Sequence, residues 1–290
     1  MARRSVFVSR DEYPFFEEIA VEFDWFPGFA LSQKRKSQIS LHKNFQKRFP
    51  EHKVLEISSA SLYSLGSALS AMSLTKMTSQ GITSVESAFQ SSRIYGSGDL
   101  QVGPFPEYMF LPGRECKRLV KEASKGQISY RYHFDGMDFY APEYHISLFY
   151  DYLYLNALLE DDNSVVSQAL TDGGYTAFTD LATLSLNCQA RSAAIFVSLM
   201  SHGFIDEIRN YDSFLRLFRT NKKGTALNST AYDNVQLLQK DGKVQLLSPV
   251  IPHSFYKEQT EAYYLENCGS LTNRKTSDNY LNKVYVQNKQ

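Results

Sequence analysis

Side chains of four different chemical types recur at helical spacing between positions 86 and 93. Glu86, Phe89, Gln90 and Arg93 stand at positions i, i+3, i+4 and i+7. On a helix, this spacing places side chains on one face in successive turns. A carboxylate on such a face could stabilise positive charge on a sugar or activate water, as carboxylates do in glycosidases. The segment is therefore a candidate active site.

A structural interpretation of Glu86 competes with the catalytic one. Thr83-Ser84-Val85-Glu86 is also a capping-box sequence. In a capping box, the carboxylate would bind backbone amides at the start of the helix. Spacing alone favours this interpretation, so a catalytic role needs support from elsewhere in the chain.

The composition predicts a folded protein and excludes several classes. Of the 290 residues, 43% are hydrophobic and 21% are charged, which is close to the average for globular proteins. Lys and Arg together number 31, as do Asp and Glu, so any attraction to nucleic acid must be local. The widely spaced Cys116, Cys188 and Cys268 fit neither a disulfide framework nor a metal cluster. We expect these cysteines to be reduced, as in the cytosol, and to bind no metal.

The hydropathy pattern contains no segment for export or membrane insertion. The start of the chain carries positive charge but lacks the apolar run of a signal peptide. No stretch of about 20 apolar residues is present for a membrane span. We expect a cytoplasmic location without membrane association.

Mainly helical elements with short strands are predicted to position the candidate site. Helices are expected over residues 113–124 and 142–159, and after Asn187 as N-cap. Short strands are expected at 53–57 and 128–132, and a hairpin at 235–238 and 244–247. The predicted fold class is α+β, mainly helical. We divide the chain into an N-terminal extension packed on the core (1–57), a catalytic core (58–219) and an accessory hairpin with a tail (220–290).

The N-terminal extension combines aromatic and basic residues. An aromatic patch at 23–29 is followed by a basic run that only Glu51 opposes; its members are Lys34, Arg35, Lys36, Lys43, Lys47, Arg48 and Lys53. Such a run is usually a solvated face. Basic groups interleaved with aromatic rings also suit single-stranded nucleic acid, so both interpretations stay open.

Several motifs resemble those of the NADAR family and follow each other in the family's order. The segment 84–93, Ser-Val-Glu-Ser-Ala-Phe-Gln-Ser-Ser-Arg, resembles the family's S-x-E-x-x-F-Q-x-x-K. Ser70-Ala71-Met72 stands where the family has an S-N-F turn, and Gly113-Arg114 lies near its A-x-x-x-G-R stretch. Asp180 falls on the family's acidic position and Asn187 on its N-x-L-G asparagine. The resemblance covers roughly residues 58–200.

The first 57 residues resemble the leader of one particular NADAR branch. Segments 21–37 and 54–58 are similar to the leader of the branch that accompanies DarT-type ADP-ribosyltransferase toxins. The resemblance implies an antitoxin ADP-ribosylglycohydrolase that removes ADP-ribose from guanine in DNA, without a cofactor. Its implied partners are ADP-ribosylated DNA and the cognate toxin. Two alternatives stay open: a non-catalytic antitoxin that binds the toxin, and an N-glycosidase acting on a small ribosylamine metabolite.

The resemblance also implies roles for individual residues. Glu86, Asp180 and Arg93 are the expected catalytic residues. The expected substrate-binding residues are Ser70, Phe89, Gln90, Tyr95, Arg114, Asn187 and Gln189. Arg93 and Arg114 would hold the diphosphate, and Phe89 or Tyr95 would stack on a base.

The sequence departs from the family pattern at two places. Arg93 occupies the position of the usual lysine, and arginine does not readily lose its proton or form an imine. We therefore do not expect a covalent lysine mechanism at that position. The Trp-Gly segment that usually precedes the family's asparagine is absent, since Trp25 is the sole tryptophan. Phe139 or Tyr140 is expected to supply a stacking surface instead.

Overall fold

A computed structural model describes most of the chain up to residue 218. The described residues are 2–96, 100–125, 127, 129, 131–140, 147–182 and 188–218, with the backbone of strands β10 (Gln236–Lys240) and β11 (Lys243–Leu247). Asn187 and most of the 220–290 tail lie outside this part of the chain.

A four-stranded sheet is built mainly from the beginning of the chain. Its strands are β1 (Ala2–Ser9), β2 (Phe16–Phe23), β3 (Val54–Glu56) and β9 (Ala177–Thr179), in the order β2-β1-β9-β3. β1 pairs antiparallel with both β2 and β9, whereas β3 runs parallel to β9. Residues 1–57 therefore share one sheet with a strand more than a hundred positions later in the sequence.

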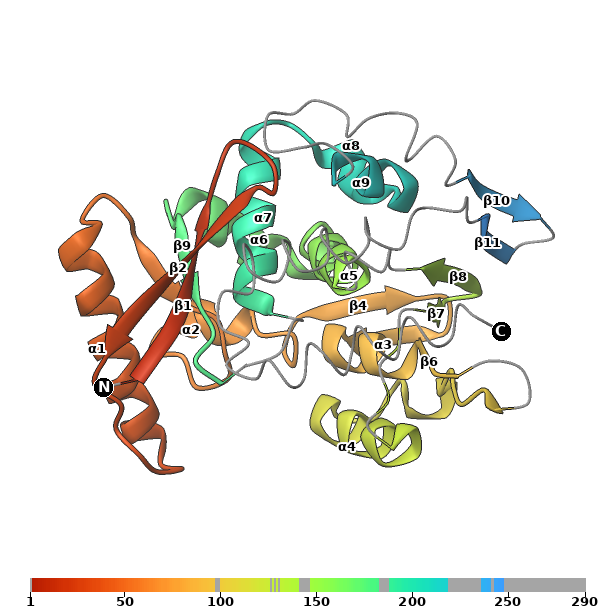
Figure 1. Ribbon diagram of the computed structural model, residues 1–290, viewed down its shortest axis with the longest axis horizontal. Coiled ribbons are helices and arrows are strands. Elements are labelled where there is room, and N and C mark those ends of the chain that lie inside the picture. Colours follow the sequence, from red (N-terminus) through yellow and green to blue (C-terminus); the bar gives the residue numbers. More distant parts are fainter. Residues whose placement is uncertain are drawn as a thin grey trace, which may run out of the picture.

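Helices cover both faces of this sheet (Figure 1). Helix α1 (Leu31–Arg48) and helix α7 (Gln189–Ser201) lie on opposite sides of β1 and β2. Alternation along β1 explains the arrangement, because Val6 and Val8 join the cluster that contains α1 residues, while Phe7 joins the cluster of α7. A sheet buried on both faces favours apolar side chains in both directions.

The remaining elements form a second layer around the buried helix α5 (Leu148–Leu158). The helices are α2 (Ser64–Ala68), α3 (Val85–Ser91), α4 (Gly113–Ser124), α6 (Ser164–Asp172), α8 (Ile205–Arg209) and α9 (Tyr211–Leu217), with short 3-10 turns at Pro106–Tyr108 and Asp161–Asn163. The strands are β4 (Thr75–Thr78) and β5 (Gly81–Ser84), which pair, and β6 (Arg93–Ile94), β7 (Arg131–Phe134) and β8 (Met137–Tyr140), which form a three-stranded sheet.

The predicted fold class and several predicted elements are confirmed. The described chain is α+β and mainly helical. Helix α4 has the predicted bounds, and β10 pairs with β11 as the predicted hairpin. Helix α7 begins at Gln189 and has Cys188 rather than Asn187 as its N-cap residue. No strand was predicted at β1 or β2, and these form the largest antiparallel pair of the sheet.

A buried ion pair joins α5 to α7. Arg191 Nη2 lies 3.0 Å from Asp151 Oδ2, and both side chains are 2% exposed. The Ser192 hydroxyl also donates to Asp151, at 2.6 Å. The pair therefore holds α5 against α7.

None of the helices in the described part of the chain combines the length and hydrophobicity needed to cross a bilayer. Within the same residues, no group of His, Cys, Asp and Glu side chains is arranged to hold a metal ion.

Candidate functional site

The Glu86 carboxylate is buried and turned away from the helix start. The cap of α3 is Ser84, whose hydroxyl accepts a hydrogen bond from the Ser87 amide at 3.1 Å. Glu86 is 6% exposed and accepts a hydrogen bond from Gln90 Nε2 at 3.1 Å. Lys117 Nζ from α4 lies 3.2 Å from the same carboxylate oxygen. The capping-box interpretation of Glu86 is therefore wrong, because Ser84 alone supplies the cap.

Gln90 links Glu86 to Arg93 in one continuous row. Its Oε1 accepts a hydrogen bond from Arg93 Nη1 at 3.2 Å, while its Nε2 donates to Glu86. The predicted alignment of carboxylate, amide and cation is thus present. Arg93 reaches it from strand β6, because α3 ends at Ser91.

Aromatic rings hold the Arg93 guanidinium. Its carbon lies 5.5 Å from the centroid of Phe89 and 5.0 Å from that of Tyr95, within the range of cation–π attraction. The Arg93 Nε atom is buried and has no hydrogen-bond partner among the described residues. The two rings and Gln90 therefore fix the guanidinium with part of its donor capacity unused.

The rings predicted to stack on a base lie inside hydrophobic clusters. Phe89 and Tyr95 are each 1% exposed, Phe89 in the main core and Tyr95 beneath α4. Phe139 is also buried and packs on Phe149, with ring centroids 4.9 Å apart. The expectation of base stacking is not met at these three residues, since packing covers their faces.

The turn around Ser70 connects the segments that meet at Glu86. Ala71 O accepts from the Glu86 amide at 2.9 Å, and Ala71 N donates to Gln189 Oε1 at 2.8 Å. Gln189 Nε2 in turn donates to Ile57 O at 2.6 Å. Both ends of the Gln189 amide are thus occupied by backbone groups. Ser70 is buried, and its hydroxyl accepts from the Met72 amide at 3.3 Å. Ser70 and Gln189 therefore stabilise the backbone around Glu86 from inside the protein.

A glycine allows α4 to approach α3 closely. A Cβ added at Gly113 would lie 2.7 Å from Met72 Sδ and 3.1 Å from Glu86 Cβ. One turn later, Lys117 reaches the Glu86 carboxylate. Arg114 beside the glycine is exposed, with Nη2 3.4 Å from the Ser59 hydroxyl. The contact therefore brings two cations of α4 to the edge of the candidate site.

Asp180 is a second buried carboxylate, directly after β9. It is 7% exposed, and its Oδ1 accepts from the Ala182 amide at 3.2 Å. Burial raises the pKa of Tyr150 well above its usual value, and the charges of Glu86, Tyr154 and Asp180 raise it further. Both predicted catalytic acids thus contribute to the raised pKa of Tyr150.

Lys117, Tyr150 and Glu56 adjoin the predicted residues and were not predicted as site residues. The sequence contains a signal for Lys117, since this residue follows Arg114 by three positions on a basic helix. The sequence also contains a signal for Glu56, because this residue is a lone carboxylate in an apolar strand. Tyr150 is one of several aromatic residues in α5, and the sequence does not distinguish it from the others.

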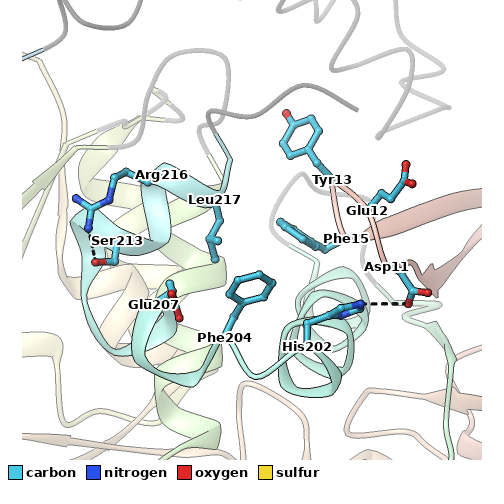
Figure 2. Close-up of a pocket in the computed structure, with 10 residues that line it drawn as sticks. All are labelled: Asp11, Glu12, Tyr13, Phe15, His202, Phe204, Glu207, Ser213, Arg216 and Leu217. Carbon is cyan, nitrogen blue, oxygen red and sulfur yellow. Dashed lines mark hydrogen bonds and ion pairs between the residues drawn. The ribbon is translucent and has the colours of Figure 1, made fainter. Parts of the chain in front are cut away.

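A cavity of about 530 Å³ lies elsewhere, between the β1–β2 turn and helices α7 to α9 (Figure 2). Its lining residues are Asp11, Glu12, Tyr13, Phe15, His202, Phe204, Glu207, Ser213, Arg216 and Leu217. None of the predicted site residues belongs to it. The candidate site therefore rests on the residues around Glu86 and Asp180.

Glu86 and Asp180 are two buried carboxylates, the type of group that glycosidases use in pairs, and Lys117 lies beside Glu86. The chain belongs to the DarT1-associated NADAR antitoxin family, whose model matches residues 2–228. A role in antagonising a toxin of the DarT type follows from this membership. A comparison with curated proteins found no match.

Proposed function

We propose that this antitoxin is an ADP-ribosylglycohydrolase that removes ADP-ribose from guanine bases in DNA. The observation that carries the proposal is the buried Glu86 carboxylate, aligned with Gln90 and Arg93 in the segment that resembles the family motif. In this function, the protein erases the mark of a DarT-type ADP-ribosyltransferase toxin.

The chemistry needs few groups. Breaking the bond between the ribose and the exocyclic amine of guanine builds positive charge on the sugar. A carboxylate at the position of Glu86 stabilises this charge and activates the attacking water. Asp180 orients the ribose hydroxyls or shares the role of base.

The cations around Glu86 suit the diphosphate of ADP-ribose. Arg93 donates to Gln90 through Nη1, which leaves other terminal N–H groups of its guanidinium for a phosphate oxygen. Arg114 and Lys117 lie at the exposed edge, where they would meet the ligand first. Both ends of the Gln90 amide are occupied, by Glu86 and Arg93. In this proposal, Gln90 keeps the Glu86 carboxylate and the Arg93 guanidinium aligned.

The direct test is an assay with a defined substrate. We expect the purified protein, without added metal or cofactor, to release free ADP-ribose from a DNA oligonucleotide that carries ADP-ribosylated guanine. The product is measured by chromatography and mass spectrometry. Stable binding of the toxin without any loss of the DNA mark would contradict the proposal and favour a non-catalytic antitoxin.

A second prediction concerns the basic face of α1, which we propose as a contact for DNA phosphates. Lys36, Lys43 and Lys47 are exposed and share one face of the helix. Deleting residues 1–53 is not a usable test, because it removes β1 and β2 from the main sheet. We expect a Lys43→Glu, Lys47→Glu variant to weaken binding of the DNA substrate and to lower the slope of log Kd against log salt by about 1 per lysine.

The matched control for this prediction reverses two cations on the far helices, Arg209→Glu and Arg216→Glu. We expect neither variant to change turnover of a free ADP-ribosyl-guanosine. Unchanged DNA binding would assign the α1 lysines to a solvated face, and equal loss on the DNA substrate and on the free nucleoside adduct would count against a DNA contact.

A further inference from the structure

A third carboxyl group, that of Glu56, lies at the same edge of the main sheet as Asp180. Glu56 is the last residue of β3 and lies opposite Thr179 in the parallel pair β3–β9. Because the strands are parallel, their carboxyl ends meet at one edge. Glu56 is 1% exposed, so its carboxyl group must be satisfied by protein groups.

The hydrogen bonds of Glu56 bracket Asp180. Its Oε2 lies 2.5 Å from the Thr179 hydroxyl, and its Oε1 accepts from the Leu181 amide at 3.1 Å. One carboxyl group thus holds the residue before Asp180 and the residue after it. The third hydrogen bond of the Glu56 carboxyl group comes from the Ser58 hydroxyl, which donates to Oε1 at 2.9 Å.

The surroundings of Glu56 leave it little freedom to move. The Thr179 hydroxyl also lies 2.8 Å from His42 Nε2, which ties the network to α1. On the other side, a Cβ added at Gly66 would lie 2.0 Å from Glu56 O, so helix α2 is in close contact with the strand end. A carboxyl group held this firmly can fix the backbone that it binds.

We propose that Glu56 is a positioning residue, which holds the backbone on both sides of Asp180 and thereby fixes the second carboxylate of the candidate site. This inference rests on the proposed function for its catalytic consequence. The bracket itself is a structural claim that can be tested separately.

The charge state of Glu56 suits this role. Burial, and secondly the charge of Asp180, raise the pKa of Glu56 to about 8. Burial lowers the pKa of His42 to about 4. At pH 7 both groups are therefore neutral. Among the described residues, Asp180 at the end of β9 and His42 on α1 are the titratable groups that face this network. As the pH rises through about 8, Glu56 loses its proton, and a negative charge forms beside Asp180.

The test compares Glu56→Gln, which mimics the neutral acid, with Glu56→Ala, which removes the bracket. Glu22→Gln on the exposed edge of β2 is the matched control. We expect Glu56→Gln to keep kcat near the wild-type value at pH 7 and to lack the decline in rate that the wild type shows above pH 8. We expect Glu56→Ala to lower kcat about 100-fold with a much smaller change in KM, because a small displacement of a reacting group has effects of this size.

A readout independent of turnover is hydrogen exchange at the Leu181 amide. We expect faster exchange in Glu56→Ala and wild-type protection in Glu56→Gln. Wild-type kcat in a folded Glu56→Ala variant would overturn the proposal, as would identical pH profiles for Glu56→Gln and the wild type. If the wild type turns over no ADP-ribosylated substrate, the proposed function fails, and unchanged Leu181 exchange in Glu56→Ala would then overturn the bracket as well. Should the alanine variant not fold, the pH profile of Glu56→Gln decides.

Discussion

Replacing Glu86 by glutamine is expected to lower the release of ADP-ribose by about 10²- to 10⁴-fold while the fold persists. The substitution keeps the size of the side chain, so the close packing against Gly113 is preserved. It removes the negative charge that would stabilise the ribosyl cation and activate water. General acid–base groups contribute about 10²- to 10⁴-fold, and we expect a loss of turnover in that range.

The structural cost of this change should be small. Lys117 loses an ionic partner, but its side chain is 57% exposed, and ion pairs that involve an exposed group contribute little to stability. Glu115→Gln, on the exposed side of α4, is the control and should keep wild-type activity. Thermal unfolding of both variants checks the fold. Full activity of Glu86→Gln would show that the catalytic carboxylate lies elsewhere.

The largest expected effect on stability comes from Asp151→Asn. The change keeps the shape of the side chain and removes its charge, so the buried Arg191 guanidinium loses the carboxylate that lies 3.0 Å away. Breaking a buried ion pair on one side typically costs about 3 to 5 kcal/mol, and we expect the free energy of unfolding to fall by that amount. Urea denaturation monitored by circular dichroism measures it.

Two controls separate this effect from general damage. Asp162→Asn, at an exposed carboxylate, should change the stability by less than about 0.5 kcal/mol. The double variant Asp151→Leu, Arg191→Met replaces both charges by apolar groups and should recover most of the loss. A single variant as stable as the wild type would mean that the ion pair contributes nothing.

The parts of the site that the sequence predicted are those set by local spacing. Glu86 and Gln90 are four residues apart on one helix, and the structure joins them by a hydrogen bond. The bounds of α4 were predictable because Arg114, Lys117 and Arg118 alternate with buried positions in an amphipathic pattern. Local periodicity carries this information without any knowledge of the tertiary structure.

Contacts between distant segments were not predictable from such patterns. β1 pairs with β9, about 170 positions later, and no periodicity within either strand identifies its partner. β2 was missed because Glu17 and Glu22 interrupt its apolar pattern, which is tolerated since β2 lies at the edge of the sheet. The bracket of Glu56 around Asp180 depends on the same distant pairing and was missed for the same reason.

The hydrogen bonds of the Gln189 side-chain amide bear on when, during synthesis, the region around Glu86 can fold. It joins Ile57 to Ala71, and Ala71 receives the Glu86 amide. During synthesis, the segments that carry Glu86 leave the ribosome about a hundred residues before Gln189 does. Until α7 has emerged, the Ala71 amide and the Ile57 carbonyl lack the hydrogen-bond partners that Gln189 supplies. We therefore expect the backbone around Glu86 to reach its final arrangement only after α7 has been translated.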